Sequence, residues 1–202
     1  MCGIAGYFQL ESPRPPDRAL IGRMVNTLHH RGPDEFGAYL DDRCVLGQAR
    51  LSIIDLAGGS QPMCNEDGSL WITFNGEIFN YLELREELVG AGHVFRTRCD
   101  TEVIIHAYEQ WGRDCLTRFN GQWAFVLYNR RDRSLFFARD RLGVRPLFYA
   151  VHGGAFYFLG EVDIIISADY ATFFDPHVTY GMPAVFEPLL MLHRDVPLGE
   201  RF

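Results

Sequence analysis

Apolar residues along the chain follow two spacings, one typical of strands and one typical of helices. Short aromatic, aliphatic and β-branched runs bounded by Gly, Asn, Asp or Pro predict strands. These runs lie at residues 3–8, around Tyr39, Val45 and Ile53, and at 70–74, 123–128, 135–139, 147–151 and 156–159. The strand at 70–74 is followed by Asn75-Gly76, a pair typical of turns, and we expect it to end there.

Three segments between these strands carry a helical spacing of apolar residues instead. The first follows Asp17, a candidate N-cap, and the third follows Asp100-Thr101. The second is expected to begin at Asn80, because Asn80 and Glu83 have the spacing of a capping box. Strands, two central helices and then further strands indicate an α+β fold in which helices pack outside layered sheets.

The segment 162–202 sustains neither spacing. Proline and glycine residues repeatedly interrupt its apolar positions, and these residues break both helices and strands. We therefore divide the chain into a folded domain at 1–161 and an irregular tail or linker at 162–202.

Composition narrows the class of protein. The chain has 202 residues, of which 48% are hydrophobic and 22% charged, as in ordinary globular proteins. Its net charge of -7 argues against a nucleic-acid binder, which needs a basic face to meet phosphates. The first ten residues lack the basic region of a signal peptide, and no segment approaches the roughly 20 apolar residues of a membrane span.

The five cysteines are odd in number and contain no C-x-x-C pair: Cys2, Cys44, Cys64, Cys99 and Cys115. This spacing predicts neither a disulfide framework nor a zinc site, so we expect no metal in this chain. A reducing cytoplasm is the compartment that such free thiols indicate.

Cys2 is the candidate nucleophile. Removal of Met1 would make Cys2 the first residue and place its α-amino group beside its thiol. An α-amino group has a pKa of about 7.7–8.0, so it could act as a general base near neutral pH without a histidine. Gly3 is expected to leave room for a substrate. Taken alone, Cys2 is better explained as a buried cysteine of the first strand, because buried cysteines are common.

Three other positions give Cys2 a context, although each has an ordinary explanation. Arg50 could bind a carboxylate through two hydrogen bonds, or be a surface arginine. Asn75 and the backbone of Gly76 could donate to an oxyanion, or form a hairpin turn. Asp100 could accept from an ammonium group, or cap a helix. Together they describe a ligand with an α-carboxylate, an α-ammonium and an acyl carbonyl, which fits glutamine.

Seven segments then make the chain resemble a known family. They are Met1-Cys2-Gly3-Ile4-Ala5-Gly6, His30-Arg31-Gly32-Pro33-Asp34, Arg50-Leu51-Ser52-Ile53-Ile54-Asp55, Gln61-Pro62-Met63, Phe74-Asn75-Gly76-Glu77-Ile78-Phe79-Asn80, Asp100-Thr101-Glu102-Val103-Ile104 and Arg139-Asp140-Arg141-Leu142-Gly143-Val144-Arg145-Pro146-Leu147. In this order they resemble the glutaminase domain (class II glutamine amidotransferase) of glutamine-hydrolysing asparagine synthetases, from residue 1 to about 161.

The resemblance implies a fold and a reaction. The fold would be a four-layer αββα sandwich of the N-terminal-nucleophile hydrolase type. Cys2 would attack the side-chain amide of L-glutamine, release ammonia and form a thioester that water hydrolyses to glutamate. Asn75 and the Gly76 N–H would form the oxyanion hole, and the His-Arg-Gly-Pro-Asp segment would be a supporting loop. The residues implied to contact glutamine are Arg50, Leu51, Ser52, Ile53, Ile54, Asn75, Gly76, Glu77 and Asp100.

Two departures limit what the resemblance implies. The nucleotide-binding loop of the family's synthetase domain does not occur before Phe202, so ATP and magnesium are expected only for an absent domain. Residues 160–165 also replace the Ser-Glu-x-Lys-Ala-Leu stretch usual in the family. The expected partners are L-glutamine and a synthetase domain or subunit that receives ammonia, and a homodimer is an open option. The alternatives are an amidotransferase with another acceptor and, should Met1 remain, a non-catalytic partner-binding domain.

Overall fold

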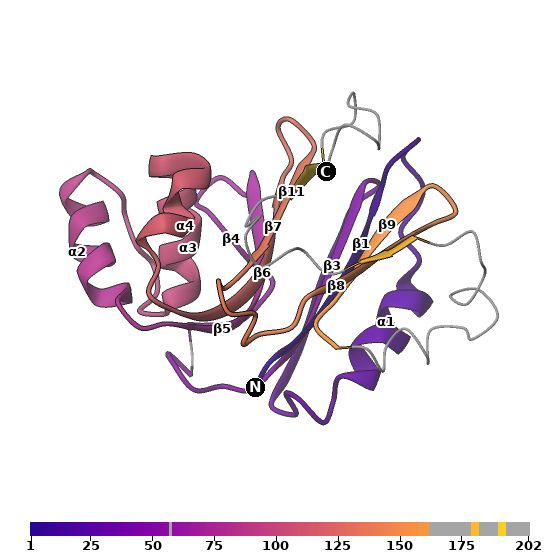
Figure 1. Cartoon of the computed structure of the whole chain (residues 1–202), viewed down its shortest axis with the longest axis horizontal. Coiled ribbons are helices and arrows are strands. Elements are labelled where there is room, and N and C mark those ends of the chain that lie inside the picture. The colour runs from indigo at the N-terminus through magenta and orange to yellow at the C-terminus, as the bar shows by residue number, and fades with distance from the viewer. Residues whose placement is uncertain (57, 162–178, 182–189, 193–202) are drawn as a thin grey trace.

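The structure is a computed structural model that describes residues 1–56 and 58–161, together with the backbone of two short strands at Thr179–Gly181 and Leu190–Leu192. Two antiparallel sheets face each other, and helices cover their outer faces (Figure 1). This arrangement confirms the α+β class and the αββα layering expected from the sequence.

The first sheet contains six strands in the order β10-β8-β9-β1-β3-β2. Their bounds are β1 Gly3–Gln9, β2 Glu35–Leu40, β3 Cys44–Arg50, β8 Phe148–His152, β9 Ala155–Leu159 and β10 Thr179–Gly181. Helix α1 (Arg18–Thr27) packs on the outer face of this sheet through Ile21, Met24 and Val25.

The second sheet contains five strands in the order β11-β7-β6-β5-β4. Their bounds are β4 Met63–Cys64, β5 Leu70–Ile78, β6 Gly121–Asn129, β7 Ser134–Arg139 and β11 Leu190–Leu192. Helices cover its outer face: α2 Tyr81–Gly90, α3 Asp100–Trp111, the 3₁₀ turn η1 Gly112–Asp114 and α4 Cys115–Arg118.

The central strands are apolar on both faces because each face is covered. In β6, Phe125 and Leu127 pack toward α3, while Val126 and Tyr128 pack between the sheets. Side chains alternate between the two faces of a strand, so one continuous apolar run supplies two hydrophobic layers. This explains why the sequence shows unbroken aromatic and aliphatic runs instead of a strict alternation of apolar and polar residues.

A buried polar contact joins the two sheets near one end of the sandwich. The Gln48 side chain on β3 donates to the carbonyl of Phe74 on β5 at 3.1 Å. Thr73 also reaches across, donating to the carbonyl of Gly47 at 3.2 Å and to the Gln48 side chain. Buried polar groups are costly unless hydrogen-bonded, so these bonds fix how β3 and β5 sit against each other.

The start of α1 confirms the N-cap predicted at Asp17, because Asp17 Oδ1 accepts from the Leu20 N–H at 2.8 Å. The capping box predicted for α2 is wrong. Asn80 precedes α2, but its side chain makes no bond to that helix. It instead accepts from the Asn120 N–H at 2.9 Å and donates to the Arg118 carbonyl at 3.0 Å.

The strand end predicted at Asn75-Gly76 is also wrong. β5 runs on to Ile78, and Gly76 pairs with Trp123 of β6. The pair is accommodated in the strand because Gly76 adopts φ 150° and a Cβ there would collide with the Gln122 carbonyl. Pairing with a long neighbouring strand therefore overrides the local turn preference.

The tail predicted to be irregular contains β10 and β11, which pair with β8 and β7. The rest of 162–202 lies outside the described residues, and the domain boundary at 161 stays a prediction. Within the part of the chain that is described, none of the helices combines the length and the apolar character needed to cross a bilayer.

Candidate active site

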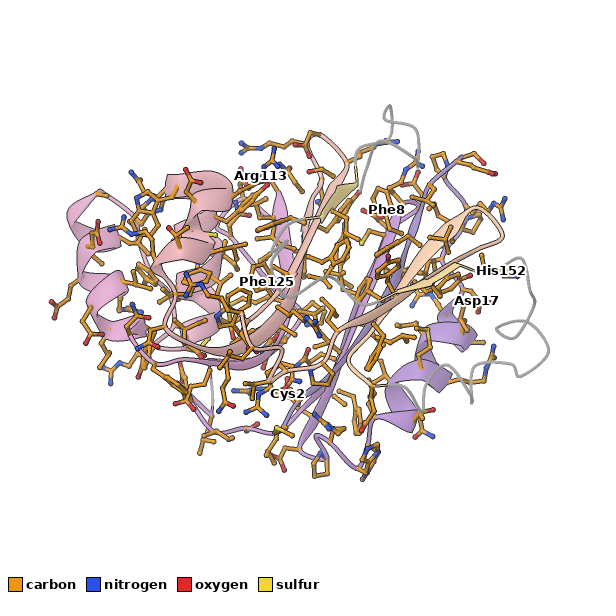
Figure 2. All side chains as sticks on the ribbon, in the orientation of Figure 1. Cys2, Phe8, Asp17, Arg113, Phe125 and His152 are labelled. Atoms are coloured by element: carbon orange, nitrogen blue, oxygen red, sulfur yellow. The ribbon has the colours of Figure 1, made fainter. Side chains whose placement is uncertain are left out.

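One pocket gathers residues from distant segments at one end of the sandwich. It has a volume of about 80 Å³. Figure 2 shows Cys2 at this end, where Figure 1 also places the N-terminus. The lining includes every residue predicted for the site except Ser52: Cys2, Arg50, Leu51, Ile53, Ile54, Asn75, Gly76, Glu77 and Asp100.

Cys2 precedes β1 and is partly exposed in the pocket. Its thiol donates to the carbonyl of Leu51, with 3.6 Å between Sγ and the oxygen. Gly3 holds it close to the helical layer, since a Cβ at Gly3 would run into the side chain of Leu28. The glycine therefore serves packing against α1, whereas the sequence suggested that it gives room to a substrate.

Met1 lies at the mouth of the same pocket and is 47% exposed. Its sulfur contacts the guanidinium of Arg145. With Met1 in place, the nitrogen of Cys2 belongs to a peptide bond and cannot accept a proton. Removal of Met1 would therefore create the base in the same residue as the thiol.

Arg50 ends β3 and is only 4% exposed, which excludes the surface-arginine reading. Its Nη1 donates to Glu35 at 2.9 Å. Both Nη atoms also donate to carbonyls of the following loop, at 2.9–3.4 Å from Ile54, Asp55 and Leu56. Arg50 thus organises the loop, and a carboxylate could bind to it only by displacing one of these acceptors.

Residues outside the loop that follows Arg50 also hold this loop in place through hydrogen bonds. The Ser52 N–H donates to Asp34 at 2.8 Å, so this part of the His-Arg-Gly-Pro-Asp segment supports the loop, and Ser52 itself does not line the pocket. The Asp55 carboxylate accepts from the Arg98 N–H at 2.8 Å and the Gly58 N–H at 3.0 Å. These bonds hold the pKa of Asp55 below its usual range.

Asn75 is the most informative side chain of the pocket. It is 1% exposed, and neither its Nδ2 nor its Oδ1 has a hydrogen-bond partner among the described residues. A buried, unpaired amide costs free energy, on the order of 1–3 kcal/mol. Because Asn75 lines the pocket, the partner it lacks is one that a ligand can supply.

The backbone of β5 directs a second donor into the same place. The Phe74 N–H donates to the side chain of Gln61 at 2.7 Å, and the Ile78 N–H donates to Asp100 at 3.1 Å. N–H groups of every second residue point to the same edge of a strand. The Gly76 N–H therefore points between these two, toward the pocket and away from β6.

Asp100 is the first residue of α3, and Cys99 occupies the N-cap position. Burial raises the pKa of the Asp100 carboxyl to about 6; the backbone N–H of Ile78 opposes the shift and the negative charge of Glu77 adds to it. A buried carboxyl with this pKa lacks a cationic partner. An ammonium group in the pocket would provide one.

Comparison with known proteins identifies this arrangement. The family model described as a glutamine amidotransferase domain matches residues 1–179. The chain belongs to this family. Membership agrees with the resemblance drawn from the seven sequence segments.

Relatives of this glutamine amidotransferase domain are glutamine-hydrolysing asparagine synthetases. Asparagine synthetase 3 of Bacillus subtilis is 39% identical over 169 residues, covering 83% of this chain and 28% of that protein. A probable asparagine synthetase of Dictyostelium discoideum is 40% identical over 167 residues, covering 82% of this chain and 30% of that protein. The chain thus spans less than a third of the length of either relative.

Solved structures share the fold at low identity. A glutamine phosphoribosylpyrophosphate amidotransferase from B. subtilis, complexed with ADP and GMP, aligns with a TM-score of 0.67 and 20% identity, over 97% of this chain and 50% of that chain. An allosteric regulatory enzyme of purine biosynthesis aligns with a TM-score of 0.72 and 20% identity, over 95% and 47%. These likenesses confirm the sandwich fold.

Several residues of the amidotransferase pocket were not assigned to it from the sequence, and two of them make informative contacts. Gln61 is buried and bridges elements, accepting from the Phe74 N–H at 2.7 Å and donating to Thr101 at 3.2 Å. Arg145 lies beside Met1 and Cys2. Both belong to segments quoted for the resemblance, but neither residue type alone indicates a role.

The loop that carries Arg145 is shaped by one buried carboxylate. Asp140 accepts from the N–H groups of Leu142, Val144 and Arg145, at 3.0–3.1 Å, and of Trp123 at 3.2 Å. A carboxylate that accepts several backbone bonds fixes a tight loop. Asp140 therefore places the Arg145 side chain at the pocket mouth.

Proposed function

We propose that this domain hydrolyses the side-chain amide of L-glutamine to L-glutamate and ammonia through a thioester on Cys2. The observation that carries the proposal is the buried amide of Asn75, which has no partner among the described residues and lies in the pocket that also contains Cys2 and Asp100. An amide with no partner next to a thiol is suited to an oxyanion that forms only during the reaction.

The chemistry would use groups of the chain and water alone. After removal of Met1, the α-amino group of Cys2 accepts the thiol proton, and the thiolate attacks the side-chain carbonyl carbon of glutamine. Asn75 Nδ2 and the Gly76 N–H donate to the oxyanion. The protonated amine then returns its proton to the departing nitrogen, the carbon–nitrogen bond breaks, and ammonia leaves a glutamyl thioester.

Water completes the cycle. The α-amino group of Cys2 takes a proton from water, the hydroxide equivalent attacks the thioester, and the carbon–sulfur bond breaks to give glutamate and the thiol. No metal or cofactor takes part in this scheme.

Substrate orientation would come from the two ends of the amino-acid backbone. The ionised carboxylate of Asp100 would accept from the α-ammonium group. The guanidinium of Arg50 would bind the α-carboxylate in exchange for one of its present acceptors. Backbone groups of the loop at 51–54 and the side chain of Glu77 line the remainder of the pocket.

The ammonia would pass to an ATP-dependent synthetase domain or subunit, with asparagine synthesis as the reaction we favour. The relatives that are about 40% identical to this domain carry that activity in their names. An amidotransferase for a different acceptor is the alternative. We place the reaction in a reducing compartment such as the cytoplasm, since Cys2 must stay a free thiol.

Intact-mass measurement and glutamate release together test the proposal. Protein that has lost Met1 should release glutamate from glutamine, and Cys2→Ala should reduce release to background while keeping the fold. Cys64→Ala is the matched control, because Cys64 is also partly exposed but lies outside the pocket. Equal turnover in Cys2→Ala and wild type would refute the nucleophile.

A second candidate function follows from the contact between Met1 and Arg145. Should this contact hold Met1 in place against removal, the domain would be a non-catalytic binding partner. Purified protein with Met1 retained and no glutamate release would establish that alternative.

A further inference from the structure

A second cluster of chemically active side chains lies on α3, away from the pocket of Cys2. His106 and Glu109 project from the helix, and His93 comes from the connection between α2 and α3. His106 is buried, with 1% of its side chain exposed, while His93 is partly exposed and Glu109 is exposed. Neither the proposed hydrolysis nor the comparisons give this cluster a role.

Three ligand-type atoms of this cluster converge on one point. His106 Nδ1 lies 3.2 Å from His93 Nδ1 and 2.9 Å from Glu109 Oε2. The third edge, from His93 Nδ1 to Glu109 Oε2, measures 3.6 Å. In a tetrahedral zinc site with bonds of about 2.1 Å, ligand atoms lie about 3.4 Å apart. The three atoms therefore already approximate one face of such a tetrahedron.

Hydrogen bonds from neighbouring side chains turn the ligand atoms of His93 and Glu109 toward the centre of the cluster. His93 Nε2 lies 3.0 Å from the side-chain oxygen of Gln110, which favours a proton on Nε2 and a free lone pair on Nδ1. Glu109 Oε1 accepts from Asn65 Nδ2 at 2.8 Å, leaving Oε2 to face the centre. Histidines and carboxylates that bind metals are held by outer contacts of this kind.

The charge around the cluster suits a cation. Two further carboxylates face His106 Nε2: Glu66 at 3.6 Å and Glu102 at 3.8 Å. Arg131 is the cationic residue that lines the adjoining pocket with His93 and Glu109, and it is paired with Asp67. Three carboxylates, those of Glu66, Glu102 and Glu109, thus lie around His106.

We propose that His93 Nδ1, His106 Nδ1 and Glu109 Oε2 bind a divalent transition-metal ion of the zinc type, with one coordination position left open. Two imidazole nitrogens and one carboxylate suit zinc better than calcium or magnesium, which prefer oxygen ligands. A cavity of about 410 Å³ lined by His93 and Glu109 gives the fourth position access for water or a small ligand. The spacing of the cysteines predicted no metal in this chain, and the three proposed ligands include no cysteine.

Metal titration of the full chain tests the proposal. The protein is first treated with a chelator, and Zn²⁺ is then added in competition with a chromophoric chelator. We expect one Zn²⁺ per chain, with His93→Ala and Glu109→Gln each weakening binding by at least about 10-fold. His29→Ala is the matched control, since His29 lies outside the cluster, and should leave binding unchanged.

Cobalt distinguishes this site from the thiols. Co²⁺ bound to nitrogen and oxygen ligands gives visible d–d bands without the near-ultraviolet charge-transfer band of a thiolate. Binding that is lost in Cys2→Ala but kept in His93→Ala would overturn the proposal.

Absence of Zn²⁺ uptake by folded wild-type protein would overturn it too, and would leave the cluster as an ion-pair network that anchors the α2–α3 connection. Thermal unfolding in chelator shows that each variant is folded before metal is added. Glutamine hydrolysis is not the readout, so the two proposals fail independently.

Discussion

Helix α3 carries a polar cluster at each end, and the two clusters differ in how their side chains are paired. At the N-terminal end, Asp100 lines the pocket that also holds the buried amide of Asn75, and residues 1–56 and 58–161 provide no partner for this amide. Farther along the helix, His106, Glu109 and their neighbours bond to one another. Without a metal ion, the groups of the second cluster find partners within the fold, whereas the Asn75 amide of the first has none among the described residues.

Mutation of Asn75 should show the difference between the two clusters most clearly, because it should affect catalysis far more than stability. Asn75→Ala removes an oxyanion donor and should lower kcat for glutamine about 10²–10³-fold. It should cost little stability, because neither atom of the amide is paired within the part of the chain that the structure describes. Initial rates at saturating glutamine, with urea unfolding of both proteins, measure the two effects.

A large loss of stability in Asn75→Ala with unchanged kcat would show instead that Asn75 serves the fold. Leu70→Ala provides a reference for a β5 side chain whose role is packing, since Leu70 belongs to the core against α3.

Asp100→Asn should separate binding from stability. Loss of the charge opposite the α-ammonium should raise KM for glutamine by about 10–100-fold, the range expected for a hydrogen bond to a charged group. The asparagine oxygen can still accept from the Ile78 N–H. Because burial disfavours the charged carboxyl, the variant should unfold at a higher temperature than wild type at pH 7.

The pKa of Asp100 also predicts how pH acts on the wild type. This pKa is raised on folding from an ordinary value of about 3.9 to about 6. The contribution of Asp100 to stability is therefore greatest at low pH and is lost as pH rises from about 4 to about 6. Glutamine binding has the opposite pH dependence, because the α-ammonium group pairs with the ionised carboxylate of Asp100. KM should therefore rise as pH falls below about 6.

The Asp100→Asn variant is the control for this pH effect. Its KM should be flat across the same range, while kcat still follows the α-amino group of Cys2. A KM that rises equally in both proteins at low pH would assign the titration to a group other than Asp100.

Local sequence signals succeeded where no distant segment competes with them. The Asp17 cap forms because its partner, the Leu20 N–H, is three residues away. The predicted cap at Asn80 failed because Arg118 and Asn120, folded against it from about forty residues away, claim its side chain. Propensity cannot describe such competition.

The pocket was predictable for a different reason. Cys2 and Asn75 were first combined because their chemistry fits one glutamine ligand, and the ordered segments of a resembling family then supported the assignment. Arg145 was missed because its position depends on the loop that Asp140 organises. The pairing of Arg50 with Glu35 was invisible as well, because it depends on the register of β2 against β3, in which these two residues are directly opposite.

The hydrogen-bonded cluster around His106 offers the converse test, in which a substitution should lower stability and leave catalysis unchanged. Glu102 accepts from the N–H groups of Arg96 and Thr97 at 2.7–2.8 Å and from the Thr97 hydroxyl at 2.6 Å. Burial opposes ionisation, but these bonds and His106 outweigh it and lower the pKa of Glu102 to about 2. Glu102→Gln should therefore destabilise the fold by about 1–3 kcal/mol.

The stability of Glu102→Gln should be measured on chelator-treated protein, because a bound metal ion would stabilise the fold and mask the loss of stability. Urea unfolding reports the stability, and kcat at saturating glutamine should stay within about 2-fold of wild type, since Glu102 does not line the pocket. A loss of kcat as large as that in Asn75→Ala would mean that the two ends of α3 are coupled.

Arg50 lies between the two cases, because it belongs to the pocket yet both of its Nη atoms are paired. Its Nη1 donates to Glu35, which would compete with the α-carboxylate of glutamine. Glu35→Gln weakens that competitor and should lower KM by a few-fold, the effect of one ordinary hydrogen bond of about 0.5–1.5 kcal/mol. Arg50→Ala should raise KM in the same assay. If Glu35→Gln raises KM instead, Glu35 positions Arg50 for the substrate, and the paired guanidinium seen here is already the binding-competent form.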